Sequence, residues 1–316
     1  MTRLPLTLAA WLAIALPWST MAQQTPSPRA GTPIRAQGLV GTWFPPVNGQ
    51  RGPAILVLGG SEGGEAMSRR TAMAIAEQGY GVLALAWFKA PGLPEQLEDI
   101  PLEYFDTAID WLKAQPLVDA RHLGLYGISK GGEAALLIAS RRPEIKAVVA
   151  AVPSSVVWQG VNMADYTQVH SSFSLGGKPV AFVPYDTNAA FTSVHDLYIR
   201  SLKSLPAHPD AIIPVERIAG PILLLSGKAD ALWPSSDLAD QVMARLDARR
   251  FAPPHRHIAY PDAGHAATVP LPEGIVGPTS AMANMGGTDA GNAFARRDAR
   301  AQLAAFYAEA LGAPTR

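Results

Sequence analysis

The sequence predicts a single α/β domain in which a mostly parallel sheet is flanked by helices. Apolar runs bounded by Gly and Pro alternate with segments of helical period, which is typical of such a sheet. The chain has 316 residues, 48% of them apolar, enough for one large core. The expected strands are residues 54–58, 81–86, 122–126, 147–152, 222–225 and 257–260, and the expected helices are 66–78, 102–115, 130–141, 235–249 and 296–311.

The strands are short continuous apolar runs, as expected for parallel strands covered on both faces. The helix expected at 102–115 has the clearest period, because its apolar residues fall on one face. The alternation stops at residues 153–217, where Ser, Pro and scattered aromatic residues leave one helical segment near 193–205. We expect 153–217 to be a cap-like insertion over the carboxyl ends of the strands.

The N-terminal residues have the pattern of a signal peptide. Within residues 1–22, Arg3 precedes an apolar run that ends in small residues. Two prolines interrupt this run, which is short for the roughly 20 apolar residues of a membrane-spanning helix. Residues 23–35 are rich in Pro, Thr, Gln and Ser and predict a flexible tether, followed by one folded domain at 36–316. We expect an exported protein, periplasmic or secreted, with no stable membrane insertion after cleavage.

Charge and cysteine content exclude several classes of function. The 26 basic and 26 acidic side chains balance, and there is no run of Lys or Arg, which argues against a nucleic-acid partner or an electrostatic membrane partner. The chain contains no cysteine, so a thiolate nucleophile, a disulfide framework and a Cys-ligated zinc are excluded. We expect a small-molecule substrate and a different nucleophile.

A G-x-S-x-G motif at residues 127–131 lies between the expected strand 122–126 and the expected helix 130–141. Small residues at both ends of the motif let the chain turn tightly, so that Ser129 is held strained and exposed at the end of its strand. The first amides of the following helix then face the reacting carbonyl. The motif and its placement predict Ser129 as a nucleophile.

A serine nucleophile needs a histidine base and an orienting carboxylate, which in the α/β-hydrolase fold follow in the order Ser, acid, His. Asp230 comes just after the strand 222–225, and His265 just after the strand 257–260. Asp237 is expected in the first turn of a helix, where a carboxylate complements the helix N-terminus. Asp262 is the stronger alternative, but so near His265 it is expected to shape a turn. We therefore predict an α/β-hydrolase fold with Ser129, Asp230 and His265 as catalytic residues.

The oxyanion hole is expected to use the backbone N–H of Lys130 and one from the Gly-rich loop 59–64. Ser61 is the first choice for this second donor, and Glu62 is the next. A phosphate-binding loop is the alternative, but the segment lacks both G-x-G-x-x-G and a G-K-[ST] ending. The side chain of Lys130 is expected to be exposed, so that only its backbone matters; attraction of an anionic substrate is the alternative.

Two further sets of residues have a functional and a structural interpretation. Five aromatic residues are candidates for an acyl pocket or for simple packing: Trp158, Phe173, Tyr185, Phe191 and Trp233. His255 and His257 have strand spacing and could form a metal pair, but no third ligand is near. We expect no metal and no organic cofactor.

Several stretches resemble the C-terminal catalytic domain of the acyl-CoA thioesterases and bile acid-CoA:amino acid N-acyltransferases, from about residue 33 to 311. They are residues 127–132, 176–185, 213–230, 233–235, 260–265 and 286–288. The resemblance implies the nucleophile, acid and base at Ser129, Asp230 and His265. Dienelactone hydrolases and exported peptidases share the architecture.

Serine rather than cysteine at the nucleophile implies, by the same resemblance, hydrolysis rather than transfer. The acyl-CoA enzymes of the family carry an N-terminal β-sandwich domain, whereas here a tether and a short lead-in precede the expected core. An exported enzyme would also meet little coenzyme A. A carboxylic ester is therefore at least as strongly expected as a thioester. Two alternatives stay open: an acyltransferase using an amine or alcohol acceptor, and a non-catalytic binding protein on a hydrolase scaffold.

Overall fold

The computed structural model describes residues 31–165, 167–272 and 285–314, and within them an eight-stranded sheet forms the centre of the molecule. The strand order is β1-β2-β4-β3-β6-β7-β10-β11. β1 and β2 form an antiparallel edge, and the other strands are parallel. The bounds are β1 Thr32–Ala36, β2 Leu39–Phe44, β3 Gly52–Leu58, β4 Gly81–Ala86, β6 Val118–Ile128, β7 Ile145–Ala151, β10 Ile222–Gly227 and β11 His255–Tyr260.

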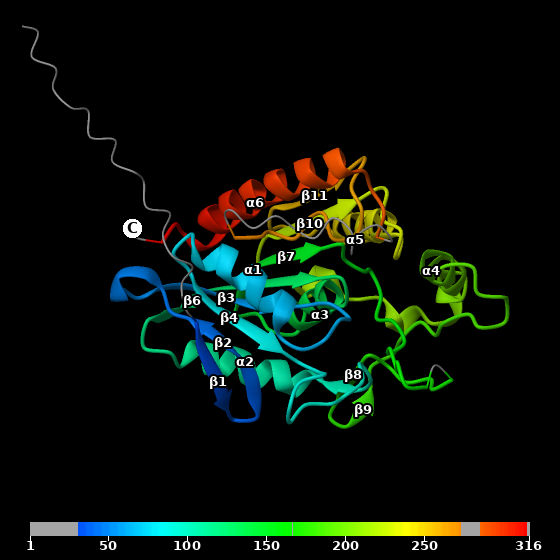
Figure 1. Ribbon diagram of the computed structural model, residues 1–316, viewed down its shortest axis with the longest axis horizontal. Helices are drawn as coiled ribbons and strands as arrows, with labels where there is room; N and C mark the ends of the chain where they lie inside the picture. Colours follow the sequence, from blue (N-terminus) through cyan, green and yellow to red (C-terminus); the bar gives the residue numbers. More distant parts are fainter. Residues whose placement is uncertain (1–30, 166, 273–284, 315–316) are drawn as a thin grey trace, which may run out of the picture.

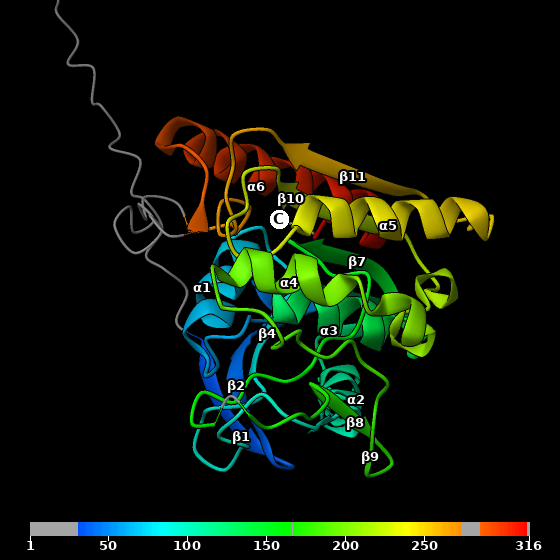
Figure 2. The same cartoon turned by 90° about the vertical axis from the view of Figure 1, so that its right-hand side faces the viewer.

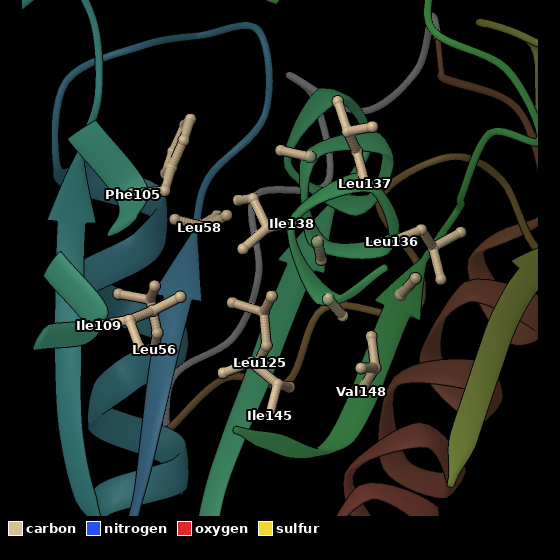
Figure 3. Close-up of a cluster of buried hydrophobic side chains, with 14 of the residues drawn as sticks. Leu56, Leu58, Phe105, Ile109, Leu125, Leu136, Leu137, Ile138, Ile145 and Val148 are labelled. Atoms are coloured by element: carbon tan, nitrogen blue, oxygen red, sulfur yellow. The ribbon is translucent and has the colours of Figure 1, made fainter. Parts of the chain in front are cut away.

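Helices cover both faces of the sheet (Figure 1). α1 (Ala66–Ala76) and α6 (Asp289–Leu311) pack on one face; α2 (Leu102–Lys113), α3 (Lys130–Ala139) and α5 (Ser235–Ala248) pack on the other. Successive side chains of each buried strand point to opposite faces of the sheet, so they pack into two hydrophobic cores, one on each face. In β3, Leu56 and Leu58 face α2 and α3, as Figure 3 shows, while Ile55 and Val57 face α1 and α6. No helix in the described ranges is long and apolar enough to span a membrane.

The predicted α/β-hydrolase fold class is confirmed, and the expected strands and helices are present with small shifts at their ends. Two strands of the eight-stranded sheet, β1 and β2, were not predicted. β1 includes residues 32–35, which were expected to be tether, and it escaped the pattern because most of it is exposed at the sheet edge. α6 begins at Asp289 rather than at residue 296; its first turns escaped prediction because Gly291 and Asn292 are poor helix formers. The expected signal peptide and tether residues 23–30 lie outside the described residues.

The insertion at 153–217 lies at the end to which the parallel strands point (Figures 1 and 2). It contains the predicted helix, α4 (Val194–Leu202), and the short strands β8 (Phe173–Leu175) and β9 (Lys178–Pro179). β8 pairs with β5 (Ile100–Pro101), which precedes α2, so the insertion is joined to the main body by backbone hydrogen bonds. Single 3-10 turns lie at Val47–Gly49, Leu205–Ala207, Pro209–Ala211 and Val215–Arg217.

Candidate active site

Ser129 occupies a strained turn between β6 and α3. Its backbone has φ 56° and ψ −122°, in the left-handed range that non-glycine residues rarely adopt. The two motif glycines permit this turn: a Cβ on Gly127 would lie 1.9 Å from the carbonyl oxygen of Gly131, and one on Gly131 would lie 2.2 Å from that of Gly59. The Ser129 N–H also donates to the Ala151 carbonyl at 2.9 Å. The fold thus fixes the serine in this conformation.

Ser129, His265 and Asp230 form one hydrogen-bonded chain. His265 Nε2 lies 2.9 Å from Ser129 Oγ, and His265 Nδ1 lies 2.8 Å from Asp230 Oδ2. All three residues are buried, with 9% of Ser129 exposed to solvent. In this geometry the imidazole can take a proton from the serine while the carboxylate stabilises the imidazolium.

Asp230 is oriented by a second set of donors, from the loop before α5 and from the first residue of α5. Its Oδ1 accepts the N–H of Leu232 at 2.9 Å and that of Trp233 at 3.3 Å. Its Oδ2, besides facing His265, accepts the hydroxyl of Ser235 at 2.6 Å. Sequence reasoning missed Ser235, because a serine at the start of a helix resembles an ordinary capping residue.

The His265 loop is held by the segment that precedes α6. The carbonyl oxygen of Met285 accepts the backbone N–H of His265 at 2.9 Å and that of Ala231 at 3.2 Å, so one acceptor joins the loops after β10 and β11. The side-chain oxygen of Asn292, in α6, accepts the N–H of Gly264 at 2.8 Å. Residues 286–288, one of the stretches that resemble the family, directly follow Met285.

The two alternative acids, Asp237 and Asp262, do not contact the His265 ring in the way that Asp230 does. Asp237 is in the first turn of α5, as expected. Asp262 uses its carbonyl oxygen to accept the N–H of Thr288 at 2.9 Å, while the carboxylate at His265 Nδ1 is that of Asp230. The geometry therefore favours Asp230 over both.

The two strand histidines face different partners. His255 Nε2 lies 3.1 Å from Asp247, whereas His257 lies 2.8 Å from Asp240 and 2.7 Å from Ser226 Oγ. The described residues include no group of three or more His, Cys, Asp or Glu side chains placed to hold a metal ion. The His257 contacts form a second Ser-His-Asp chain, but Ser226 is 0% exposed within a regular strand, so a substrate cannot reach it.

The two segments expected to supply oxyanion donors, the start of α3 and the loop after β3, both lie beside the nucleophile. α3 begins at Lys130, so its N–H is among the amides without an intrahelical acceptor. A Cβ on Gly60, in the loop after β3, would lie 3.1 Å from Ser129 Cβ and 2.9 Å from Glu62 Oε2. Glu62 Oε1 accepts the Gly60 N–H at 3.0 Å, and Ser61 between them is exposed. Desolvation raises the pKa of the Glu62 carboxyl group. Backbone hydrogen bonds, including the one from Gly60, and the charge of His265 lower this pKa but only partly offset the rise.

The Lys130 side chain is buried, so the expectation that it is exposed is wrong. Only 1% of the residue is accessible, and Nζ lies 2.6 Å from Glu133 Oε2 and 2.7 Å from Ser172 Oγ. The first turn of α3 faces the insertion, which the helical period alone could not reveal. Burial lowers the pKa of Lys130 and raises that of Glu133, and their mutual attraction opposes both shifts.

The five aromatic residues considered for an acyl pocket lie in different parts of the structure. Trp158 and Trp233 are buried in the core of the insertion, and Tyr185 stacks on Trp158 with ring centroids 6.3 Å apart. Phe173 instead joins the core between the sheet and α2. Phe191 is 67% exposed and, with Tyr185, lines a cavity of about 580 Å³ in the insertion.

The sheet topology, with a serine on a strained strand–helix turn hydrogen-bonded to a His–Asp pair from later strand ends, is that of the α/β-hydrolase fold. Solved structures agree on the fold. A putative dienelactone hydrolase from Klebsiella pneumoniae aligns with a TM-score of 0.56 and 19% identity, covering 89% of this chain and 98% of that one. A puromycin-hydrolyzing peptidase from Mycobacterium tuberculosis aligns with a TM-score of 0.57 and 18% identity, covering 89% of this chain and 39% of that one.

Within this class, the chain belongs to the family described as BAAT / acyl-CoA thioester hydrolase C terminal, whose model matches residues 100–313. The mitochondrial acyl-coenzyme A thioesterase 2 of Mus musculus is 32% identical over 284 residues, and acyl-coenzyme A thioesterase 1 of Homo sapiens is 31% identical over 292 residues. Each alignment covers 89% of this chain, but only 60% and 65% of the respective relative. The chain thus spans less than two thirds of their length.

Proposed function

We propose that this protein is a serine hydrolase that cleaves an acyl ester or thioester through an acyl-enzyme on Ser129. The observation that carries the proposal is the hydrogen-bonded chain from Ser129 through His265 to Asp230, built on a strained turn. Membership of the acyl-CoA thioester hydrolase family supports the same chemistry.

In the first half-reaction, Ser129 Oγ attacks the acyl carbon and His265 Nε2 takes the hydroxyl proton. The oxyanion accepts the N–H of Lys130 and one from the Gly-rich loop, for which Ser61 and Glu62 are the candidates. The bond to the leaving group then breaks, and His265 gives its proton to the departing oxygen or sulfur. In the second half-reaction, water attacks the acyl-enzyme with His265 as base, which releases the acid and restores the serine.

The substrate we propose is a small acyl compound, and the relatives named acyl-coenzyme A thioesterases support a thioester. Burial of the three side chains suits acyl transfer, because a site shielded from bulk water strengthens electrostatic stabilisation of the oxyanion. We also propose export on the basis of residues 1–22. Fractionation of expressing cells should recover a shortened protein outside the cytoplasm; full-length protein in the cytoplasm would argue against export.

The test is labelling of the purified protein with a fluorophosphonate probe, in wild type, Ser129→Ala and Ser226→Ala. Ser226 is a matched control because its hydroxyl also faces a His–Asp pair. We expect labelling of wild type and Ser226→Ala, and none of Ser129→Ala. Hydrolysis of p-nitrophenyl esters and acyl-CoA thioesters of graded length should fall by several orders of magnitude in Ser129→Ala.

Labelling of Ser129→Ala at the wild-type rate, or unchanged turnover, would place the nucleophile elsewhere. A folded wild type that is neither labelled nor active on any acyl compound would favour a binding protein. Acyl product that appears on an added amine rather than as free acid would favour an acyltransferase.

A further inference from the structure

Two oppositely charged side chains are fully buried in the first turn of α3, directly after the candidate nucleophile. Lys130 is 1% exposed and Glu133 is 0% exposed, with 2.6 Å between Nζ and Oε2. A buried ion pair contributes little net stability, because desolvation of two charges offsets their attraction, and apolar replacements are often equally stable. Stability is therefore a weak reason for this pair to lie beside Ser129.

The pair fixes the backbone of one residue of the insertion, Trp158. Glu133 Oε1 accepts the Trp158 N–H at 3.1 Å. Lys130 Nζ donates to Ser172 Oγ at 2.7 Å, and Ser172 Oγ donates to the Trp158 carbonyl at 2.9 Å. Both polar groups of the Trp158 backbone are thereby tied to the first turn of α3.

Trp158 begins a series of edge-to-face aromatic contacts that reaches His265. The ring centroids of Trp158 and Tyr198 are 4.7 Å apart, and those of Tyr198 and Trp233 are 5.2 Å apart. Trp233 in turn lies 5.8 Å from the imidazole of His265, and its indole N–H donates to the Val152 carbonyl at 3.2 Å. A displacement of Trp158 would therefore be transmitted through packed rings to the base.

Lys130, one member of this ion pair, also carries the proposed oxyanion donor, which is its backbone N–H. The Lys130 N–H is the first amide after Ser129, so the anchoring of the Lys130 side chain also restricts the orientation of that N–H. Direct attraction of an anionic substrate by Lys130 is a poor alternative, because its ammonium is buried and already bonded to Glu133 and Ser172.

We propose that Lys130 and Glu133 are positioning residues: their ion pair locks the first turn of α3 to Trp158 and so aligns the Lys130 N–H and the rings over His265. Ser172 is the third member of this lock. The inference rests on the proposed hydrolase function, because it assigns these side chains a role in acyl transfer.

The test is the double variant Lys130→Met/Glu133→Gln, which removes both charges and keeps an acceptor for the Trp158 N–H. We expect a folded protein with thermal stability close to that of wild type, kcat lowered by about 10- to 100-fold and KM nearly unchanged, because misplaced catalytic groups slow the chemical step. The matched control is Arg245→Met/Glu216→Gln, an ion pair also 2.6 Å apart that joins α5 to the 3-10 turn Val215–Arg217, far along the chain from Ser129. It should retain kcat within about twofold.

Ser172→Ala is the second variant, since it breaks the link between Lys130 and Trp158 without leaving an unpaired charge. It should lower kcat by about tenfold with little effect on KM. A folded double variant with wild-type kcat would overturn the proposal; if the double variant does not fold, wild-type kcat in Ser172→Ala would do so. Failure of the hydrolase function itself is distinguishable, because wild type would then show neither turnover nor labelling.

Discussion

Gly127→Ala tests whether the strained turn depends on the absence of a side chain. The added Cβ would lie 1.9 Å from the Gly131 carbonyl oxygen and 2.9 Å from the Gly132 nitrogen. Ordinary carbon–oxygen contacts begin above about 3 Å, so the strand and the helix must separate by roughly 1 Å. Both neighbours are backbone atoms of α3, so no side-chain rotation can relieve the contact.

The expected cost is about 3 kcal/mol of unfolding free energy, at the upper end of the range for overpacked sites. Since a displacement of about 1 Å can cost about 100-fold in rate, kcat/KM should fall at least that far. Urea denaturation and p-nitrophenyl ester turnover measure the two effects. The control is Gly52→Ala, because a Cβ on that glycine has no atom within 4 Å. A Gly127→Ala protein with wild-type stability and turnover would refute the reasoning.

Three further variants test the carboxylates and their partners. Asp230→Asn should lower kcat by about 10⁴-fold through loss of imidazolium stabilisation, while Asp262→Asn should stay within about twofold; the reverse order of effects would exchange their roles. Ser235→Ala removes the 2.6 Å hydrogen bond to Asp230 and should lower kcat by about tenfold; unchanged kinetics would show that the backbone donors suffice. Hydrogen bonding to Arg142 lowers the pKa of Glu144 from 4.5 to about 2, so its stabilisation is complete above pH 4.5 and is lost as the pH falls toward 2. Glu144→Gln should therefore lower the free energy of unfolding by about 1 kcal/mol at pH 7, with the difference from wild type vanishing near pH 2; a difference that persists there would contradict the assignment.

The sequence-based predictions are accurate for elements set by local interactions and fail for elements set by contacts between distant segments. Short apolar runs and helical periods are local, so they located the six parallel strands and the main helices. β1 has no such pattern, because its strand conformation comes from pairing with β2 at an exposed edge. Sequence periodicity gives little indication of a strand that is held mainly by backbone hydrogen bonds to its neighbour.

The candidate site shows the same division. The G-x-S-x-G motif and the strand-end positions of Asp230 and His265 identified the three residues that the fold brings within hydrogen-bond distance. Ser235 and Asn292 were missed, because each acts through a contact that only the folded loops create.

The sequence by itself determined the fold class, the strained turn at Ser129 and the chain order of nucleophile, acid and base, since each depends on residue type and local spacing. Only the tertiary structure decided which carboxylate faces His265, and that the Lys130 side chain turns inward to Glu133 and Ser172. The physical reason is that burial and long-range hydrogen bonding depend on how separate segments pack. The pairing of α3 with an insertion some 40 residues further along the chain is such a property, as the contact between Lys130 and Ser172 shows.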